Sequence, residues 1–215
     1  MMMMIFLTVI LLLNPALPIF VLTQPTTKKM VYTLALQWPC SICNVKTCIP
    51  AHPPQQVFTL HGLWPNNKRK PHVIVPYNGP KNISQHRMLN ASWPNVENSS
   101  DNLGFWKYEW DKHGIYSGLN QADYFDLAMK LRQNVQVETH IKNGGIKLGA
   151  SNNINMTTVL TAALKVDVVV KCNLDKNKNP QVWEVRICYD PIKKALMSCS
   201  TNAQDKCPST YEIPL

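Results

Sequence analysis

Apolar and polar residues alternate along two short stretches near the start of the chain. In residues 31–38, VYTLALQW, the polar side chains of Thr33 and Gln37 interrupt an apolar run that ends before a proline. Residues 56–65, QVFTLHGLWP, alternate in the same way and also end at a proline. Because side chains of a strand point alternately to opposite faces, both stretches are predicted to be β-strands.

Helical patterning follows in the middle of the chain. NLGFWKYEWDKHG predicts a helix that ends at Gly114, since glycine commonly follows the last helical turn. Further helices are predicted at residues 121–134 and near residues 155–165. Residues 66–102 contain proline, asparagine and serine throughout and are predicted to form a loop.

The last part of the chain returns to strand patterning. Residues 165–172 and 182–189 are rich in valine and isoleucine and flank the turn sequence DKNKNP. Residues 39–56 are rich in proline and cysteine and are predicted to form a disulfide-linked loop. The order of strands, helices and strands predicts an α+β fold, with a central, mostly antiparallel sheet packed against several helices in one disulfide-stapled domain.

The N-terminal segment is set apart by its composition. Residues 1–23 carry no charge and are almost wholly apolar, but two prolines interrupt them and polar residues follow. A membrane span would have a similar length. We interpret the segment as a secretory signal peptide, cleaved between Phe20 and Thr27, which leaves residues 24–215 as the mature domain and predicts an extracellular protein.

Four Asn-x-Ser/Thr motifs fit a secreted protein, since this motif is the acceptor of N-linked glycans. Three of the four lie close together, which predicts an exposed, glycosylated loop there. The acceptor residues are Asn82, Asn90, Asn98 and Asn155.

Seven cysteines gather near the two ends of the predicted domain. In a secreted chain they indicate disulfides. Zinc binding is the competing interpretation, because Cys40 and Cys43 form a C-x2-C pair, but no second pair follows at the spacing of a zinc finger. The odd number leaves one cysteine over, or available for a bond between chains.

The chain is basic, with a formal net charge of +9. The apolar N-terminal segment contributes nothing to this excess. Such a charge favours a polyanionic partner, which could be a nucleic acid, a cell-wall polymer or an anionic membrane, although a merely basic secreted protein has the same composition.

The stretch FWKYEWDKHGIY carries the first candidate chemistry. At 100° per residue, Phe105, Glu109, Lys112 and His113 fall within an arc of about 100° on one helix face. An ordinary amphipathic helix with ion pairs near its C-terminus would look the same. The i, i+4 spacing of the acid and the histidine also suits a metal, but a lysine on that face repels a divalent cation and attracts a phosphate.

FTLHGLWP supplies a second imidazole, at His61. Two imidazoles, a carboxylate and an ammonium group suit the cleavage of RNA without a metal. One histidine would take the proton of the ribose 2′-hydroxyl and the other would protonate the leaving 5′-oxygen. A cation would stabilise the charge of the transition state.

These two segments resemble the two active-site segments of the T2 family of secreted ribonucleases. The resemblance extends from LQWP through FTLHGLWP, SWP and FWKYEWDKHG to EVRICYD, which covers most of the predicted mature chain. It implies that His61 is the general acid and His113 the general base, and that Glu109 and Lys112 stabilise the transition state. Trp64 would support the site.

The resemblance further implies a substrate cleft lined by Gln37, Phe105 and Trp106. The products would carry a 2′,3′-cyclic phosphate and a free 5′-hydroxyl, and no metal or other cofactor is implied. The protein would act on single-stranded RNA as a monomer without stable membrane association.

The chain departs from the family pattern at two positions. Tyr108 replaces a histidine that many relatives carry, which is expected to alter phosphate binding without abolishing activity. Tyr116 stands where the family generally has a cysteine, and no cysteine occurs between Cys48 and Cys172. By resemblance the remaining disulfides would be Cys43–Cys48, Cys172–Cys207 and Cys188–Cys199, with Cys40 left over.

The basic composition is similar to that of the S-RNases of plant pistils, which act in self-incompatibility. For such a protein the partner would be a pollen F-box protein. An S-like ribonuclease for phosphate scavenging or defence is the alternative biology. A catalytically inactive binding or storage protein on the same fold is the alternative from another class, and the intact pair of histidine segments disfavours it.

Overall fold

The computed structural model describes residues 29–49, 55–66, 75–200 and 207–215. The predicted signal peptide and its cleavage site lie outside these described residues. Within the described part of the chain, no helix is both long enough and apolar enough to cross a membrane.

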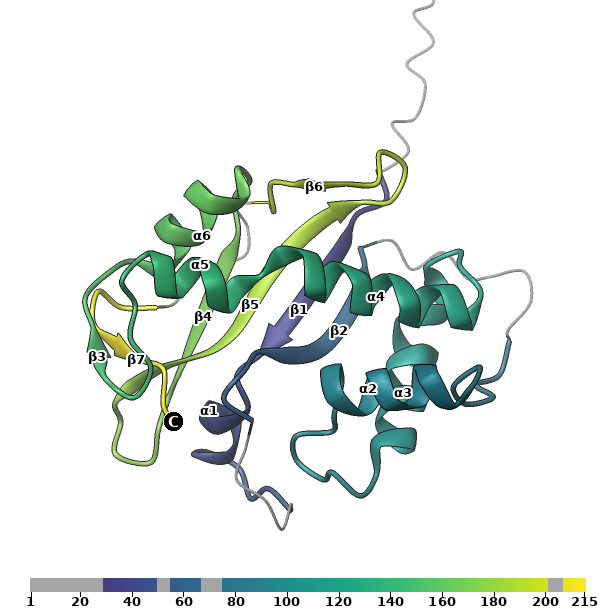
Figure 1. Cartoon of the computed structure of the whole chain (residues 1–215), viewed down its shortest axis with the longest axis horizontal. Helices are drawn as coiled ribbons and strands as arrows, with labels where there is room; N and C mark the ends of the chain where they lie inside the picture. Colours follow the sequence, from purple (N-terminus) through teal and green to yellow (C-terminus); the bar gives the residue numbers. More distant parts are fainter. Residues whose placement is uncertain (1–28, 50–54, 67–74, 201–206) are drawn as a thin grey trace, which may run out of the picture.

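A twisted sheet forms the centre of the molecule (Figure 1). Its strands follow the order β2-β1-β5-β7-β3, and β4 and β6 also pair with β5. All the pairings are antiparallel except the short one between β5 and β7. The strands are β1 (Tyr32–Gln37), β2 (Thr59–Pro65), β3 (Ser151–Asn152), β4 (Val169–Leu174), β5 (Pro180–Asp190), β6 (Ala195–Met197) and β7 (Tyr211–Glu212).

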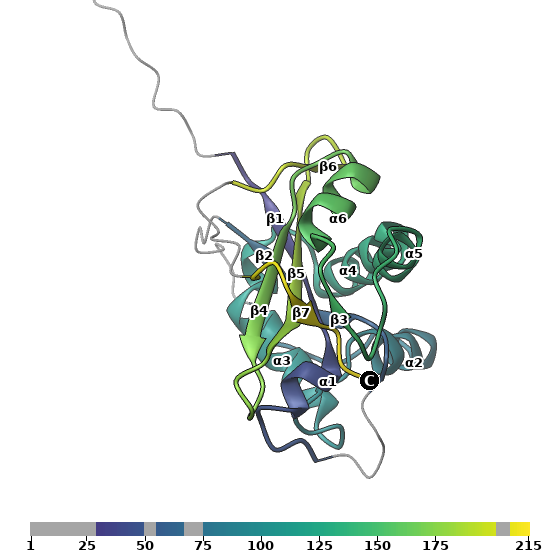
Figure 2. The same cartoon turned by 90° about the vertical axis from the view of Figure 1, so that its left-hand side faces the viewer.

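Helices pack against this sheet, and α4, α5 and α6 lie along one of its faces (Figure 2). The predicted α+β architecture with a mostly antiparallel sheet is therefore confirmed. The helices are α1 (Pro39–Cys43), α2 (Ile83–Ser92), α3 (Asn102–Lys112), the 3₁₀ turn η1 (Gly114–Tyr116), α4 (Gln121–Val135), α5 (Val137–Asn143) and α6 (Met156–Leu164).

The strands β1 and β2 agree with the predicted alternation only in part. Strand β1 lies between β2 and β5, so five of its six residues are buried and alternation is lost. In β2 the register against β1 shifts, because Leu36 pairs with Leu60 whereas Ala35 pairs with Gly62. This β-bulge leaves His61 opposite no residue of β1.

The prediction that residues 66–102 form only loop is wrong for helix α2. Asn82 caps this helix, and its side chain accepts a hydrogen bond from the Gln85 backbone N–H. Only Gln85 and Leu89 of α2 are buried, so the sequence shows too few apolar residues to reveal a helical period. The polar residues that indicated a loop belong to its cap and its exposed face.

Helices α1 and α5 also escaped the sequence patterns. Pro39 is the first residue of the short helix α1, a position where the missing N–H of proline costs nothing. Gln136 adopts a left-handed conformation with φ of 40°, and this residue separates α4 from α5. The three helices predicted from periodicity correspond to α3, α4 and α6.

Three disulfides join the cysteine pairs that the resemblance implied. They are Cys43–Cys48, Cys172–Cys207 and Cys188–Cys199. Cys40 takes no part in them; it is buried, and its Sγ lies 4.0 Å from the carbonyl oxygen of Gln55.

Candidate active site

The bulge in β2 places His61 and Trp64 on the same side of the sheet. In a regular strand, residues three apart would point to opposite faces. The extra residue at the bulge lets Leu60 and Leu63 both enter the core, while the rings of His61 and Trp64 contact each other with centroids 4.9 Å apart. Trp93 fixes the strand here, because its indole N–H donates to the carbonyl oxygen of His61 at 3.1 Å.

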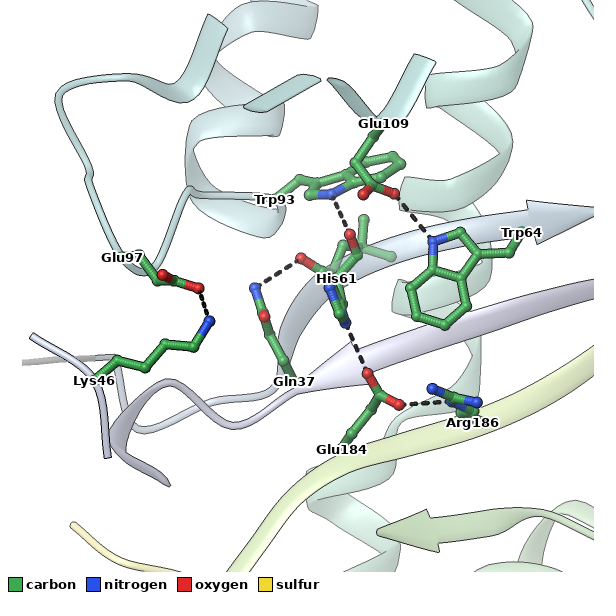
Figure 3. Close-up of polar contacts among 10 residues, drawn as sticks. Gln37, Lys46, His61, Trp64, Trp93, Glu97, Glu109, Glu184 and Arg186 are labelled. Atoms are coloured by element: carbon green, nitrogen blue, oxygen red, sulfur yellow. Dashed lines mark hydrogen bonds and ion pairs between the residues drawn. The ribbon is translucent and has the colours of Figure 1, made fainter. Parts of the chain in front are cut away.

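The imidazole of His61 is held by a carboxylate from strand β5, which lies two strands away from β2, on the far side of β1 (Figure 3). Its Nδ1 lies 2.7 Å from Oε2 of Glu184, which is 0% exposed. The other carboxylate oxygen accepts a hydrogen bond from Nε of Arg186 at 2.6 Å. The sequence motifs did not indicate this contact, although an acid in the middle of a strand as apolar as VWEVRICY was a signal that it has a buried partner.

Helix α3 brings Glu109 to the same place. Its carboxylate is 1% exposed and accepts a hydrogen bond from the indole N–H of Trp64 at 3.0 Å. Burial raises the pKa of Glu109 from 4.5 to about 7, and the charge of Glu184 adds to the rise. The Trp64 hydrogen bond and the charges of His61 and Lys112 oppose it, so Glu109 is partly protonated near neutral pH.

A glycine is required where β2 passes this hydrogen bond. A Cβ atom at Gly62 would lie 2.0 Å from Nε1 of Trp64 and 2.3 Å from Oε2 of Glu109. The side chain of any other residue would therefore displace the indole or the carboxylate.

Helix α3 ends at Lys112, and His113 occupies the C-cap position. The rings of His113 and Trp64 lie 5.3 Å apart at an interplanar angle of 30°. A glycine is needed at position 114, because a Cβ atom there would lie 2.3 Å from the Trp110 ring. Trp64 thus contacts both imidazoles and Glu109.

Lys112 is exposed and contacts a residue that departs from the family pattern. Its ammonium group donates a hydrogen bond to the hydroxyl of Tyr108 and lies 4.7 Å from the centroid of that ring. Tyr108 itself is 50% exposed. The lysine predicted to bind phosphate is therefore positioned by the residue that replaces a histidine.

The residues expected to line the substrate cleft differ in their exposure. Phe105 is half-buried, whereas Gln37 is 5% exposed and donates from its amide to the carbonyl oxygen of Leu60 at 3.3 Å. Trp106 is 0% exposed, and its indole N–H donates to the Trp93 carbonyl oxygen at 2.7 Å. As a correction, Trp106 has no surface to offer a substrate, and it belongs to the core that holds α3.

An ion pair between Lys46 and Glu97 lies at the edge of this region (Figure 3). The backbone N–H of Ile49 also donates to the Glu97 carbonyl oxygen at 2.9 Å. The loop after α1 is thereby joined to the loop that leads into α3.

Hydrogen bonds join the segment of residues 75–79, which follows β2, to α3 and α4. The indole N–H of Trp110 donates to the carbonyl oxygen of Val75 at 2.8 Å, which ties α3 to the segment after β2. Gln121 accepts a hydrogen bond from the Asn78 backbone N–H at 3.0 Å and so ties the same segment to α4. Tyr116 is half-buried in η1.

The four predicted glycan acceptors differ in exposure. Asn82 and Asn155 are exposed and cap α2 and α6, whereas Asn90 and Asn98 are half-buried. Their glycosylation stays a prediction. Among the described residues, no three histidine, cysteine, aspartate or glutamate side chains are grouped so that they could hold a metal ion.

Comparisons with known proteins agree with this fold. A sequence model of the ribonuclease T2 family matches residues 29–199. The intracellular ribonuclease LX of Solanum lycopersicum is 30% identical over 198 residues, covering 83% of this chain and 81% of that protein. The extracellular ribonuclease LE of the same species is 31% identical over 193 residues, covering 83% and 84%. Ribonuclease S-2 of Nicotiana alata is 30% identical over 182 residues, covering 77% and 79%.

Solved structures share the architecture. A mutant of RNase MC1, a protein of bitter gourd seeds, in complex with 5′-UMP gives a TM-score of 0.69 at 25% identity, covering 86% of this chain and 98% of that one. The self-incompatibility-associated SF11-RNase of Nicotiana alata gives a TM-score of 0.72 over 87% and 100%, and at 24% identity it shows the fold alone. The chain belongs to the ribonuclease T2 family. It is an endoribonuclease of the T2 type.

Proposed function

We propose that this protein is a secreted ribonuclease that cleaves single-stranded RNA by metal-free transphosphorylation, with His113 as general base and His61 as general acid. One observation carries the proposal: the Trp64 ring contacts both imidazoles, with centroids 4.9 Å and 5.3 Å away, and its N–H holds Glu109. Two groups that could exchange protons therefore both lie against one aromatic ring.

In the proposed reaction, two protons are transferred and one bond to phosphorus replaces another. His113 takes the proton of the ribose 2′-hydroxyl, and the 2′-oxygen forms a bond to phosphorus. The bond between phosphorus and the 5′-oxygen breaks, and His61 gives its proton to that oxygen. The products are a 2′,3′-cyclic phosphate and a free 5′-hydroxyl.

Glu109 and Lys112 would stabilise the charge that develops on the phosphate oxygens. An ionised carboxylate would repel that charge, but the neutral carboxyl can donate a hydrogen bond to it. The buried position of Glu109 favours the neutral form. The exposed ammonium of Lys112 would attract the phosphate directly.

RNA is the proposed substrate on three grounds. The site offers proton donors and acceptors together with a cation, the chain has a net charge of +9, and the similar RNase MC1 mutant binds 5′-UMP. Gln37, which donates to the residue before His61, and Phe105, which precedes Glu109 by one helical turn, remain the proposed contacts to the nucleotide. No cofactor is proposed, and the protein is proposed to act as a monomer without stable membrane association.

The biological setting is proposed to be that of an S-RNase, which would be toxic to self pollen tubes and recognised by a pollen F-box protein. The basic sequence pI of about 9.2 supports this role. Ribonucleases LX and LE are as similar to this chain as ribonuclease S-2 is, so an S-like role in phosphate scavenging or defence is the second candidate. Expression confined to styles supports the first role, and induction in phosphate-starved leaves supports the second.

The activity test uses the purified protein, single-stranded RNA and EDTA. Wild-type protein is expected to degrade the RNA, and His61→Ala and His113→Ala are each expected to lower the rate by about 100-fold or more while keeping the native circular dichroism spectrum. A requirement for added metal, or full activity of either variant, would contradict the proposal. An inactive but folded wild-type protein would instead support a binding or storage role.

A further inference from the structure

Glu184 is a buried charged group whose contacts the proposed reaction does not yet explain. Its side chain is 0% exposed in the middle of β5, and each carboxylate oxygen has a different partner. Oε1 accepts from Arg186, and Oε2 lies 2.7 Å from Nδ1 of His61. A carboxylate that is removed from water costs several kcal/mol unless such partners replace the water.

A purely structural ion pair with Arg186 would account for only one of these contacts. The guanidinium group is half-exposed and could pair with an acid at the surface, where an ion pair has little cost. Here the acid is instead buried beneath His61, and its second oxygen is directed at the ring nitrogen. The geometry is that of a carboxylate that sets the orientation and the tautomer of a histidine.

We propose that Glu184 is a positioning residue for His61: its carboxylate holds the proton on Nδ1 and leaves Nε2 as the nitrogen that serves the leaving 5′-oxygen. This inference rests on the proposed role of His61 as general acid. When His61 is charged, both ring nitrogens carry protons, and Glu184 stabilises the ring in place. When His61 has given up its Nε2 proton, the other proton remains on Nδ1, where it is hydrogen-bonded to Glu184.

Neighbouring contacts hold Glu184 and His61 in position. The Trp93 indole N–H fixes the backbone of His61 from the opposite side. The Arg186 guanidinium lies 5.1 Å from the centroid of the Trp64 ring, so it contacts both the buried carboxylate and the indole that holds Glu109. Glu184 therefore lies at the centre of a connected set of polar contacts that includes the acid side of the site.

The distinguishing variant is Glu184→Gln, which keeps the size of the side chain. If the amide oxygen of the glutamine accepts from Arg186, its NH2 group faces Nδ1 of His61. An NH2 donor cannot accept the Nδ1 proton, so the variant disfavours the form of His61 that donates from Nε2. The matched control is Glu138→Gln, because Glu138 also pairs with an arginine, Arg132, and accepts from a backbone N–H, but does not contact His61.

Two substrates distinguish a loss of proton donation by His61 from a general structural defect of the enzyme. Uridylyl-adenosine has a leaving alkoxide that needs a proton, whereas uridine 3′-(4-nitrophenyl phosphate) has a leaving group that departs without one. Glu184→Gln is expected to lower kcat by about 100-fold on the first substrate with KM changed by less than about threefold, and by less than about fivefold on the second. Glu138→Gln is expected to retain wild-type kcat on both.

His61→Ala makes the two hypotheses distinguishable. It is expected to show the same selective loss on uridylyl-adenosine. If His61→Ala lowers kcat equally on both substrates, the proposed role of His61 as general acid fails. If His61→Ala is selective and Glu184→Gln is either fully active or equally impaired on both substrates, only the inference about Glu184 is overturned.

A measurement on the wild-type protein holds even if Glu184→Gln does not fold. In protein labelled with ¹⁵N at histidine, the neutral ring of His61 is expected to carry its proton on Nδ1 with a hydrogen-bonded proton signal. His61→Ala identifies the signal by its disappearance. A neutral ring with the proton on Nε2 would overturn the inference.

Discussion

Two regions of this molecule are held together by different means. In the disulfide-linked strands β4, β5 and β6, the disulfides Cys172–Cys207 and Cys188–Cys199 add covalent links to the strand pairing. The active-site helix region, formed by α3, η1 and residues 75–79, has no such link, because the sequence contains no cysteine between Cys48 and Cys172.

Tryptophan side chains hold the active-site helix region together in place of disulfides. Trp106 and Trp110 are almost fully buried, and each donates its indole N–H to a backbone carbonyl oxygen, of Trp93 and Val75 respectively. Trp93 in turn donates to His61. The contacts that hold α3 to the rest of the domain thus also fix the strand that carries the first histidine, so stability and geometry of the site are coupled there.

The largest effect on stability is expected from the disulfide-linked strands. Replacing Cys172 and Cys207 together by serine removes a link across 35 residues of sequence. Loop-closure entropy predicts a loss of about 4 kcal/mol in the free energy of unfolding. Activity at 25 °C on RNA is expected to stay within about twofold of wild type, because neither cysteine contacts the site. Urea unfolding and initial rates measure the two quantities, and a large loss of kcat in the folded variant would break the comparison.

A somewhat smaller effect is expected in the pH dependence of the free energy of unfolding, and it arises from Glu109 in the active-site helix region. The pKa of Glu109 is about 7 in the folded protein against 4.5 ordinarily. A raised acid pKa contributes stability that is fully present below pH 4.5 and is lost as the pH rises through 7. At 1.36 kcal/mol per pKa unit the loss is about 3 kcal/mol.

The variant Glu109→Gln tests this assignment, since its amide oxygen can still accept from Trp64 but does not titrate. Its free energy of unfolding is expected to fall less steeply than that of wild type between pH 4.5 and 7. The two proteins differ only at this position, so the difference between their curves is assigned to Glu109. Parallel curves from urea unfolding at several pH values would show that Glu109 is not the group concerned.

The smallest of the three effects is expected at Trp110. Trp110→Phe removes the hydrogen bond to Val75 and part of the buried ring, at a cost of about 2 kcal/mol. Because His113 follows at the end of the same helix, kcat is also expected to fall, by about tenfold.

The matched control is Trp38→Phe. Trp38 is 0% exposed, and its N–H donates to the carbonyl oxygen of Pro214 at 2.7 Å, away from α3. A similar loss of stability with unchanged kcat is expected. Equal effects of the two variants on kcat would remove the distinction between the regions.

Sequence patterns predicted those parts of the site whose residues lie close together along the chain. Helix angles placed Glu109, Lys112 and His113 on one face, and α3 brings Glu109 and His113 to Trp64. The disulfide pairs followed from the family resemblance. Strand patterning located β1, β2, β4 and β5 because apolar runs of that length are typical of strands.

Features that depend on register or tertiary contact were not predictable in this way. The bulge at His61 requires knowledge of the pairing between β1 and β2. Contact between Glu184 and His61 joins residues 123 positions apart. The resemblance implied that Trp106 lines the substrate cleft, but the packing of α3 buries it completely. Helix α2 was missed because too few of its residues are buried.

The identity of the first product distinguishes two-histidine transphosphorylation from other ways of cleaving RNA. Uridylyl-adenosine is incubated with wild-type protein in EDTA, and ³¹P NMR follows the phosphorus during the reaction. Two-histidine transphosphorylation predicts uridine 2′,3′-cyclic phosphate as the first product, together with adenosine that has a free 5′-hydroxyl. A 5′-phosphate on adenosine, formed without a cyclic intermediate, would contradict the account.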